Sequence, residues 1–146
     1  RTFAFEADGK TLRLGTGICY ESVYGELMGN FVKNGADVLA VITNDSWWGD
    51  SQGHGQHFEM SRLRAVETRR YVLRAANGGF SGVIDPTGKV LEKTDYGERT
   101  ALHAKVYAQG GETFYVKHGD YIARTAVALT FAALLFCIIA AIVRRP

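Results

Sequence analysis

The sequence is poor in cysteine and proline, and its charges nearly cancel. Its 146 residues include two cysteines, two prolines, 17 basic and 15 acidic side chains, a net charge of +2. Cys19 and Cys137 could form one disulfide at most, which excludes a disulfide-stapled secreted scaffold. A hydrophobic content of 47% with so little proline argues against a disordered chain. The small net charge argues against nucleic acid as a partner.

A long apolar run closes the sequence. Residues 126–143 form a stretch of eighteen residues without a charge, close to the roughly 20 that a helix needs to cross the hydrocarbon of a bilayer. We therefore expect a globular domain over residues 1–120, and a transmembrane helix with a short basic tail over residues 121–146. A buried core helix is the alternative. Arg144 and Arg145 favour a cytoplasmic C-terminus, which places the globular domain outside, whereas Lys117 and Arg124 favour the opposite orientation; the arginine pair, nearest the span, decides for the first.

The start of the sequence carries neither a Met nor an apolar signal segment, because it opens at Arg1 and continues with polar residues. A domain outside the membrane needs such export information. The alanines of the apolar run would also let other helices approach closely. We therefore expect this sequence to be the C-terminal part of a longer protein, with further membrane helices upstream.

The globular part alternates strand and helix patterns. Two strands, residues 2–6 and 11–18, are expected around a tight turn at Asp8-Gly9. Four further strands are expected at residues 38–43, 72–76, 80–84 and 89–93. A helix with Ser22 as its N-cap is expected to run to about Asn34, and an amphipathic helix to cover 56–71. This order predicts α/β layering, with ligands bound at the carboxyl ends of the strands.

Cys19 ends the second strand and is the candidate nucleophile. At a strand-to-helix turn its sulfur would stand above the sheet, where the N–H groups and dipole of the helix stabilise a thiolate or an oxyanion. The alternative is a small buried hydrophobe. Glu21 either lines the same pocket or caps the helix from the surface.

The remaining candidate bases show no local pattern that selects one of them: His54, His57, Glu59 and Glu67. His54 and His57 with Glu59 match no recognised metal-ligand spacing, so a solvated loop and helix start is the preferred interpretation. We expect no metal and no organic cofactor.

A polar loop after the third strand carries two adjacent tryptophans, Trp47 and Trp48. Such rings either plug a core beneath the loop or form a wall for a lipid chain at the membrane surface. Asn44 and Asp45 are suited to brace the turn.

Four segments form a combined pattern: Ile18-Cys19-Tyr20-Glu21, residues 43–49 (TNDSWWG), residues 56–67 with Gln-His and RLRAVE, and Arg74-Ala75-Ala76-Asn77. Together they resemble the C-terminal portion of the bacterial apolipoprotein N-acyltransferases, the membrane-anchored branch of the nitrilase superfamily of carbon-nitrogen hydrolases. The resemblance implies an α-β-β-α sandwich on the periplasmic face of the inner membrane. Of this sandwich, the sequence would supply the C-terminal part and one transmembrane helix.

The resemblance also implies an activity. Such enzymes move an acyl chain from a phospholipid to the α-amino group of the diacylglyceryl-modified N-terminal cysteine of a lipoprotein, through a cysteine thioester. Cys19 matches the nucleophile, Tyr20 the residue whose backbone N–H meets the oxyanion, and Glu21 a further required carboxylate. Trp47 matches the loop tryptophan near the acyl site, and Trp48 and Asn44 complete the expected substrate contacts.

The sequence departs from this family before the cysteine. The general-base glutamate and the lysine of the superfamily lie far upstream of the nucleophile, whereas Glu6 and Lys10 sit on a hairpin too close to Cys19 to replace them. We therefore expect this sequence alone to be inactive. Two other functions stay open: a membrane-tethered amidase that uses the same cysteine, and a non-catalytic module that only packs or binds.

Overall fold

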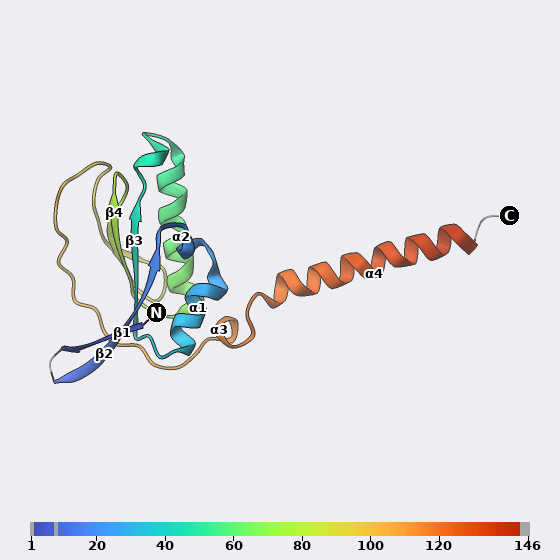
Figure 1. Ribbon diagram of the computed structural model, residues 1–146, viewed down its shortest axis with the longest axis horizontal. Helices are drawn as coiled ribbons and strands as arrows, with labels where there is room; N and C mark the ends of the chain where they lie inside the picture. The colour runs from blue at the N-terminus through green and yellow to red at the C-terminus, as the bar shows by residue number, and fades with distance from the viewer. Residues whose placement is uncertain (1, 8, 144–146) are drawn as a thin grey trace.

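A computed structural model of the chain describes residues 2–7 and 9–143 (Figure 1). Its strands are β1 (Thr2–Ala7), β2 (Lys10–Ile18), β3 (Val38–Asn44), β4 (Val72–Asn77), β5 (Gly82–Ile84) and β6 (Val90–Lys93). Its helices are η1 (Cys19–Val23), α1 (Gly25–Lys33), η2 (Ser46–Trp48), α2 (Gln52–Thr68), α3 (Phe114–His118) and α4 (Tyr121–Val143). The two η elements are short 3₁₀ turns. The chain is therefore a mixed α/β fold, as the sequence predicts.

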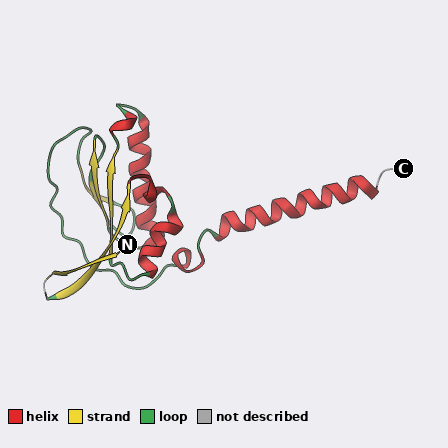
Figure 2. Cartoon of the chain, in the orientation of Figure 1, coloured by secondary structure: helices red, strands yellow, loops and turns green. Residues whose placement is uncertain are grey.

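The strands form one six-stranded sheet in the order of the sequence. β2, β3 and β4 pair in parallel, while β1, β5 and β6 add antiparallel strands at the two sides. In the parallel part Ile18 is paired with Ile42, and Asn44 with Asn77. The carboxyl ends of three strands therefore meet at one edge of the sheet (Figure 2).

The two faces of the sheet are covered differently. α1 and α2 lie on one face (Figure 1), and the core between them and the sheet is built from the buried side chains Met28, Phe31, Val32, Leu39, Val41, Phe58, Ala65, Val72 and Ile84. On the other face, residues 100–106 run past β3 and β4 and leave a cavity of about 400 Å³. Ile42 is 52% exposed there. Burial on both faces, expected for the third strand, is therefore incomplete.

The predicted hairpin is confirmed. β1 and β2 pair antiparallel from Thr2 with Gly15 to Ala7 with Lys10, and Gly9 supplies a φ of +72°. That angle lies in the left-handed region, which glycine adopts without a steric cost. Asp8, the other residue of the predicted turn, lies outside the described residues.

The helix predicted after Cys19 begins later than expected. The η1 turn comes first, and α1 starts at Gly25 with Tyr24 as its N-cap, so the expectation of Ser22 as N-cap is wrong. Ser22 is buried and its hydroxyl serves the turn instead. α2 starts four residues earlier than position 56, because Ser51 caps it by accepting a hydrogen bond from the Gly53 N–H.

α2 buries a polar face. The residues that it turns inward are His54, His57, Phe58, Ser61, Arg64, Ala65 and Thr68. Leu63 and Val66, two of the three apolar positions behind the predicted amphipathic helix, are 45% and 39% exposed. Of the expected apolar stripe only Phe58 is buried, and it joins Ala65 in the hydrophobic core, while the rest of the buried face is polar.

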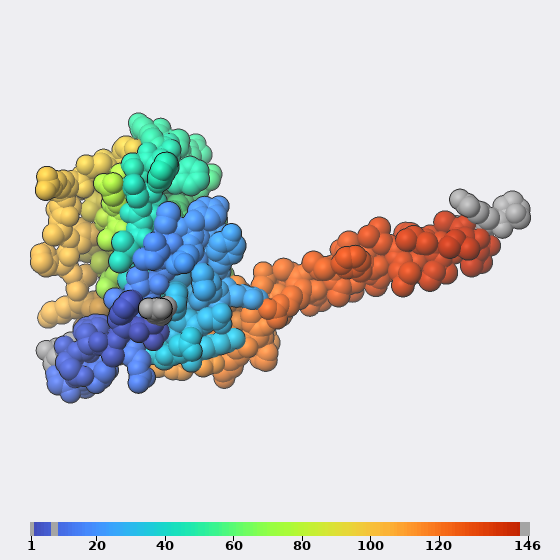
Figure 3. Space-filling view, in the orientation of Figure 1, coloured from blue at the N-terminus to red at the C-terminus, as the bar shows by residue number. Residues whose placement is uncertain are grey.

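α4 extends away from the globular part (Figure 3). Its 23 residues have a mean hydropathy of 2.9 over the most apolar window, and none of that window is buried. At 1.5 Å per residue the helix measures about 35 Å, which exceeds the roughly 30 Å hydrocarbon layer. The helix is long and apolar enough to cross a membrane, and within the described residues it is not a buried core helix. Arg144 and Arg145 lie outside the described residues.

Candidate active site

Cys19 stands on a sharp turn at the carboxyl end of β2. It is the first residue of η1 and has a φ of +52°. A residue with a side chain adopts this left-handed conformation only where its surroundings impose it. The thiol is partly exposed and not engaged in a disulfide. Gly17 lets the turn approach α1, since a Cβ there would lie 2.7 Å from the Met28 sulfur. The predicted place of Cys19 at the end of a strand is confirmed, but the 3₁₀ turn η1 follows it, and α1 begins only at Gly25.

The two residues after Cys19 lie at the surface of the turn. Glu21 accepts a hydrogen bond from the Ile18 backbone N–H at 2.8 Å, and so closes the turn around the cysteine. This geometry favours the capping interpretation of its carboxylate. The ring of Tyr20 is 53% exposed, and its centroid lies 5.9 Å from that of His57.

A chain of buried side chains leads inward from the turn. The Ser22 hydroxyl donates to the Cys19 carbonyl at 2.8 Å and lies 3.0 Å from His57 Nε2. On the other side of the ring, His57 Nδ1 lies 2.9 Å from Asp45 Oδ1. Among the candidate bases, His57 is thus the one linked to the cysteine, and the link runs to the Cys19 backbone.

Asp45 is the centre of this network and is wholly buried at the end of β3. It accepts hydrogen bonds from Thr43 Oγ1 at 2.8 Å and from Arg74 Nη2. Burial alone would raise the pKa of Asp45, but Arg74 and the hydrogen bonds from His57 and Thr43 outweigh burial and lower the pKa below the ordinary aspartate value. Asp45 is therefore a carboxylate at neutral pH.

Arg74 brings β4 into the same network. Its guanidinium donates to Ser61 Oγ at 2.9 Å and to the Phe80 carbonyl at 3.2 Å, in addition to Asp45. Burial lowers the pKa of Arg74, while the charges of Asp45 and of the Cys19 thiolate act in the opposite direction. The Cys19 side chain therefore lies within electrostatic range of the buried guanidinium.

The tryptophan loop lies beside this network. Asn44 Oδ1 accepts from the backbone N–H of Ser46 at 3.2 Å and from Asn77 Nδ2 at 3.1 Å, so Asn44 braces the loop as predicted. Trp47 is 83% exposed, and a core plug is therefore excluded for it. The Trp48 ring packs against Gly53. A small cavity of about 80 Å³ brings Tyr20, Trp48 and His57 together.

Two glycines after β4 allow Asp45 its position, a role that the sequence reading misses. A Cβ on Gly79 would lie 2.7 Å from the Asp45 Cβ, and one on Gly78 would lie 2.6 Å from the Ser46 Cβ. Gly78 also has a φ of +62°. Five residues of this network are not predicted from the sequence as site residues: Ser22, Thr43, Ser61, Arg74 and Gly79. Thr43 could have been predicted from the sequence, because it belongs to the polar residues that follow the apolar run of the third strand.

The other candidate bases lie elsewhere. His54 is buried, with its ring stacked 4.4 Å from the Tyr96 ring centroid, so the expectation of a solvated loop is wrong. Glu59 is exposed and pairs with Arg62 at 2.7 Å. Within residues 2–7 and 9–143, no three His, Cys, Asp or Glu side chains are grouped as a metal site.

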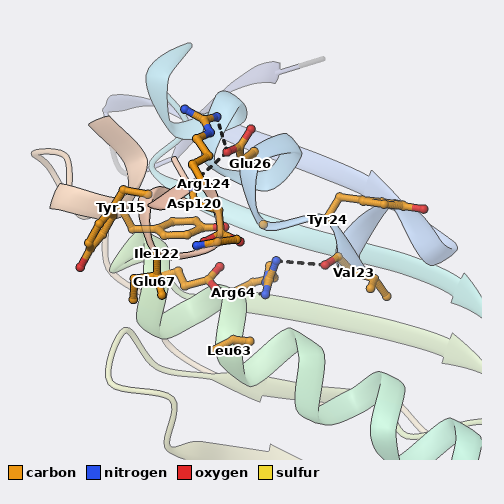
Figure 4. Close-up of a pocket in the computed structure, with 13 residues that line it drawn as sticks. Val23, Tyr24, Glu26, Leu63, Arg64, Glu67, Tyr115, Asp120, Ile122 and Arg124 are labelled. Atoms are coloured by element: carbon orange, nitrogen blue, oxygen red, sulfur yellow. Dashed lines mark hydrogen bonds and ion pairs between the residues drawn. The ribbon is translucent and has the colours of Figure 1, made fainter. Parts of the chain in front are cut away.

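Glu67 belongs to a second, larger cavity of about 910 Å³ at the root of α4 (Figure 4). Arg64 crosses it, donating to the Val23 carbonyl at 3.1 Å and to Glu67 at 3.2 Å. Burial raises the pKa of Glu67, Arg64 opposes this effect, and Asp120 adds to it. Cys19 does not line this cavity, which lies where the apolar helix joins the globular part.

Comparison with known proteins identifies a family for the chain. The sequence profile described as "Carbon-nitrogen hydrolase" matches residues 3–114. The apolipoprotein N-acyltransferase of Thermotoga maritima is 37% identical over 92% of this chain and 27% of its own length. That of Chlorobaculum tepidum is 36% identical over 94% of this chain and 25% of its own length. A mutant of the Nesterenkonia AN1 amidase from the nitrilase superfamily superposes with a TM-score of 0.49 at 23% identity, over 65% of this chain and 37% of that chain.

The fold and the site define a class of α/β proteins that present a partly exposed cysteine on a sharp turn at the carboxyl edge of the sheet. Within that class, the chain belongs to the carbon-nitrogen hydrolase family, as the profile match over most of its length shows. The chain spans about a quarter of the length of the curated relatives it matches, which are named apolipoprotein N-acyltransferases. The similarity is the one that the sequence motifs predict.

Proposed function

We propose that this chain is part of a membrane enzyme that transfers an acyl chain from a phospholipid to the N-terminal α-amino group of a diacylglyceryl-modified lipoprotein. The observation that carries the proposal is Cys19, partly exposed in a left-handed turn beside a loop whose Trp47 is 83% exposed. The names of the relatives support the acceptor and the reaction.

The first step is acylation of Cys19. The thiolate attacks the ester carbonyl of the phospholipid, the backbone N–H of Tyr20 stabilises the oxyanion, and the carbon–oxygen bond to glycerol breaks as the carbon–sulfur bond is completed. The glycerol oxygen leaves with a proton, giving a lysophospholipid.

The second step is aminolysis. The α-amine of the lipoprotein attacks the thioester, a carbon–nitrogen bond forms, and the Cys19 thiolate leaves while the amine loses its proton. Trp47 and Trp48 form an apolar wall for the acyl chain, and Asn44 holds their loop. A partly apolar pocket at the membrane surface limits water, the competing acceptor.

Both steps need a general base that accepts a proton, and neither Glu21 nor His57 is free to act as one. Glu21 is committed to the Ile18 N–H, and His57 to Asp45 and Ser22. We therefore assign general-base and lysine functions to residues of the protein outside this sequence, and the chain alone is inactive. The globular part faces the periplasm and α4 crosses the inner membrane, with its C-terminus in the cytoplasm.

Labelling with phospholipid tests this function. The full-length protein, incubated with vesicles whose phospholipid carries a radiolabelled acyl chain, should acquire the label, and Cys19→Ala should not. Cys137→Ala is the matched control, since this thiol lies in α4, and it should label like the wild type. Undiminished labelling of Cys19→Ala refutes the proposal.

The same material separates the alternatives. A family member that acts as a tethered amidase should hydrolyse small amides through Cys19 and take no label from phospholipid. A non-catalytic module should show neither activity. Transfer of the label onto a diacylglyceryl peptide with a free α-amine supports the acyltransferase.

A further inference from the structure

The peptide bond between Cys19 and Tyr20 is controlled from its carbonyl side. No cis peptide bond occurs in the described chain, and in a trans peptide the C=O and N–H groups lie in one plane and point in opposite directions. The direction of the Cys19 carbonyl therefore sets the direction of the Tyr20 N–H. That carbonyl accepts the Ser22 hydroxyl at 2.8 Å, and Ser22 is wholly buried.

The Ser22 hydroxyl takes part in two buried hydrogen bonds, one as a donor and one as an acceptor. A hydroxyl has one proton, and Ser22 gives it to the Cys19 carbonyl. The 3.0 Å contact between Ser22 Oγ and His57 Nε2 is then a hydrogen bond only if Nε2 carries the proton and Ser22 accepts it. His57 thus donates from both ring nitrogens, from Nε2 to Ser22 and from Nδ1 to Asp45. In this state Ser22 can rotate its proton only by losing one of its two buried hydrogen bonds.

The ring of His57 is fixed in turn from two strands. Its Nδ1 donates to Asp45 Oδ1 after β3 at 2.9 Å, and Asp45 is held in turn by the guanidinium of Arg74 on β4. His57 is only 4% exposed, and Asp45 is not exposed at all. Tyr20 lies on the remaining side of the ring. A rigid polar chain therefore runs from the sheet to the backbone of the turn.

We propose that His57, acting through Ser22, is a positioning residue that aims the Tyr20 N–H at the oxyanion formed on the acyl group bound to Cys19. This role rests on the proposed function, because it requires a reaction through a tetrahedral intermediate. The left-handed Cys19 needs such support, since a strained conformation persists only where its surroundings over-determine it.

The expected size of the effect follows from the geometry of oxyanion donors. A donor must lie about 2.7–3.1 Å from the oxyanion, and loss of one costs roughly 10²–10³ in rate. Ser22→Ala keeps the Tyr20 N–H as a donor and removes only the hydrogen bond that aligns it. We expect acylation of Cys19 by a p-nitrophenyl ester to slow by about 10- to 100-fold, since a misplacement of about 1 Å can cost about 100-fold.

A second reaction of the same thiol separates alignment from general damage. Iodoacetamide alkylates Cys19 by direct displacement, which forms no oxyanion. In the full-length protein, Ser22→Ala should alkylate at a rate within about threefold of the wild type while acylation falls. Thr68→Val is the matched control, because Thr68 is also buried and donates to a backbone carbonyl, that of Arg64 at 2.7 Å, away from the turn. It should leave both rates unchanged.

Two changes of His57 extend the test. The amide of His57→Gln offers an N–H donor to Ser22 in place of Nε2 and should keep most of the acylation rate. His57→Leu offers none and should fall like Ser22→Ala, and the double variant should be no slower than the slower single variant, since both changes break one chain.

Two results would overturn the positioning role. One is acylation by Ser22→Ala within threefold of the wild type. The other is an equal loss of acylation and alkylation in both Ser22→Ala and His57→Leu, which would mean collapse of the turn. The ester needs no phospholipid, so failure of the wild type to take label from vesicles would refute the proposed function and leave this comparison intact.

Discussion

Replacing Asp45 by asparagine should destabilise the protein strongly. The side chain is wholly buried and compensates the buried Arg74, while also accepting from Thr43. Asp45→Asn keeps the volume and removes the charge, so the guanidinium loses its counter-ion. Breaking a buried pair from one side costs about 3–5 kcal/mol. At roughly 2–4 °C per kcal/mol for a domain of this size class, the melting temperature should fall by about 6–20 °C.

Calorimetry of the full-length protein in detergent measures this shift. Asp50→Asn is the matched control, because Asp50 is exposed on the same loop, and it should melt with the wild type. If the unpaired cation causes the loss, adding Arg74→Met to Asp45→Asn should restore at least half of it. A fall in melting temperature no larger for Asp45→Asn than for Asp50→Asn would refute the reasoning.

The pH dependence of the same variant has a definite sign. The pKa of Asp45 is lower in the folded chain than its ordinary value, so the stability that its charge contributes is present above the unfolded pKa of about 3.9. It is lost as the pH falls through the folded-state pKa. The difference in melting temperature between wild type and Asp45→Asn should therefore be constant near neutrality and narrow below about pH 4.

Three further changes test other parts of the structure. Burial raises the pKa of Glu67, so its charge costs stability once the pH rises through that pKa; Glu67→Gln should raise the melting temperature at neutral pH and leave it unchanged in acid. Gly15→Ala should cost about 1–3 kcal/mol because its Cβ would lie 2.6 Å from the Phe31 Cβ. Gly55→Ala in α2 meets only an ordinary contact at 3.9 Å and should stabilise by about 0.5–1 kcal/mol. Trp47→Ala should leave the stability within about 0.5 kcal/mol but slow acylation from phospholipid vesicles several-fold, with acylation by a short soluble ester unchanged.

The position of Cys19 could be predicted because local patterns determine it. The sequence signals lie close to Cys19: a glycine turn, an apolar strand and two glycines before the cysteine. The structure confirms the strand and the turn. The parallel order of β2, β3 and β4 follows from the alternation of strands and helices. The same applies to α4, whose composition alone indicates a span.

The buried network could not be read in the same way. His57 meets Asp45 across 12 residues of sequence, and Arg74 meets Asp45 across 29. Apolar periodicity identifies the face of a helix that is buried by hydrophobic contact, whereas α2 buries a polar face whose partners come from two strands. The prediction of Ser22 as a helix cap is wrong for the same reason, since its partner His57 lies 35 residues away in the sequence.

Peptide mapping of the acyl-enzyme tests the central assignment most directly. The full-length protein is incubated with a phospholipid of one defined acyl chain, digested with trypsin and analysed by mass spectrometry. The peptide covering residues 14–33, which contains Cys19 as its single cysteine, should gain the mass of that acyl group and lose it on treatment with hydroxylamine. Absence of the adduct from this peptide, or its presence on the peptide that contains Cys137, would contradict the assignment.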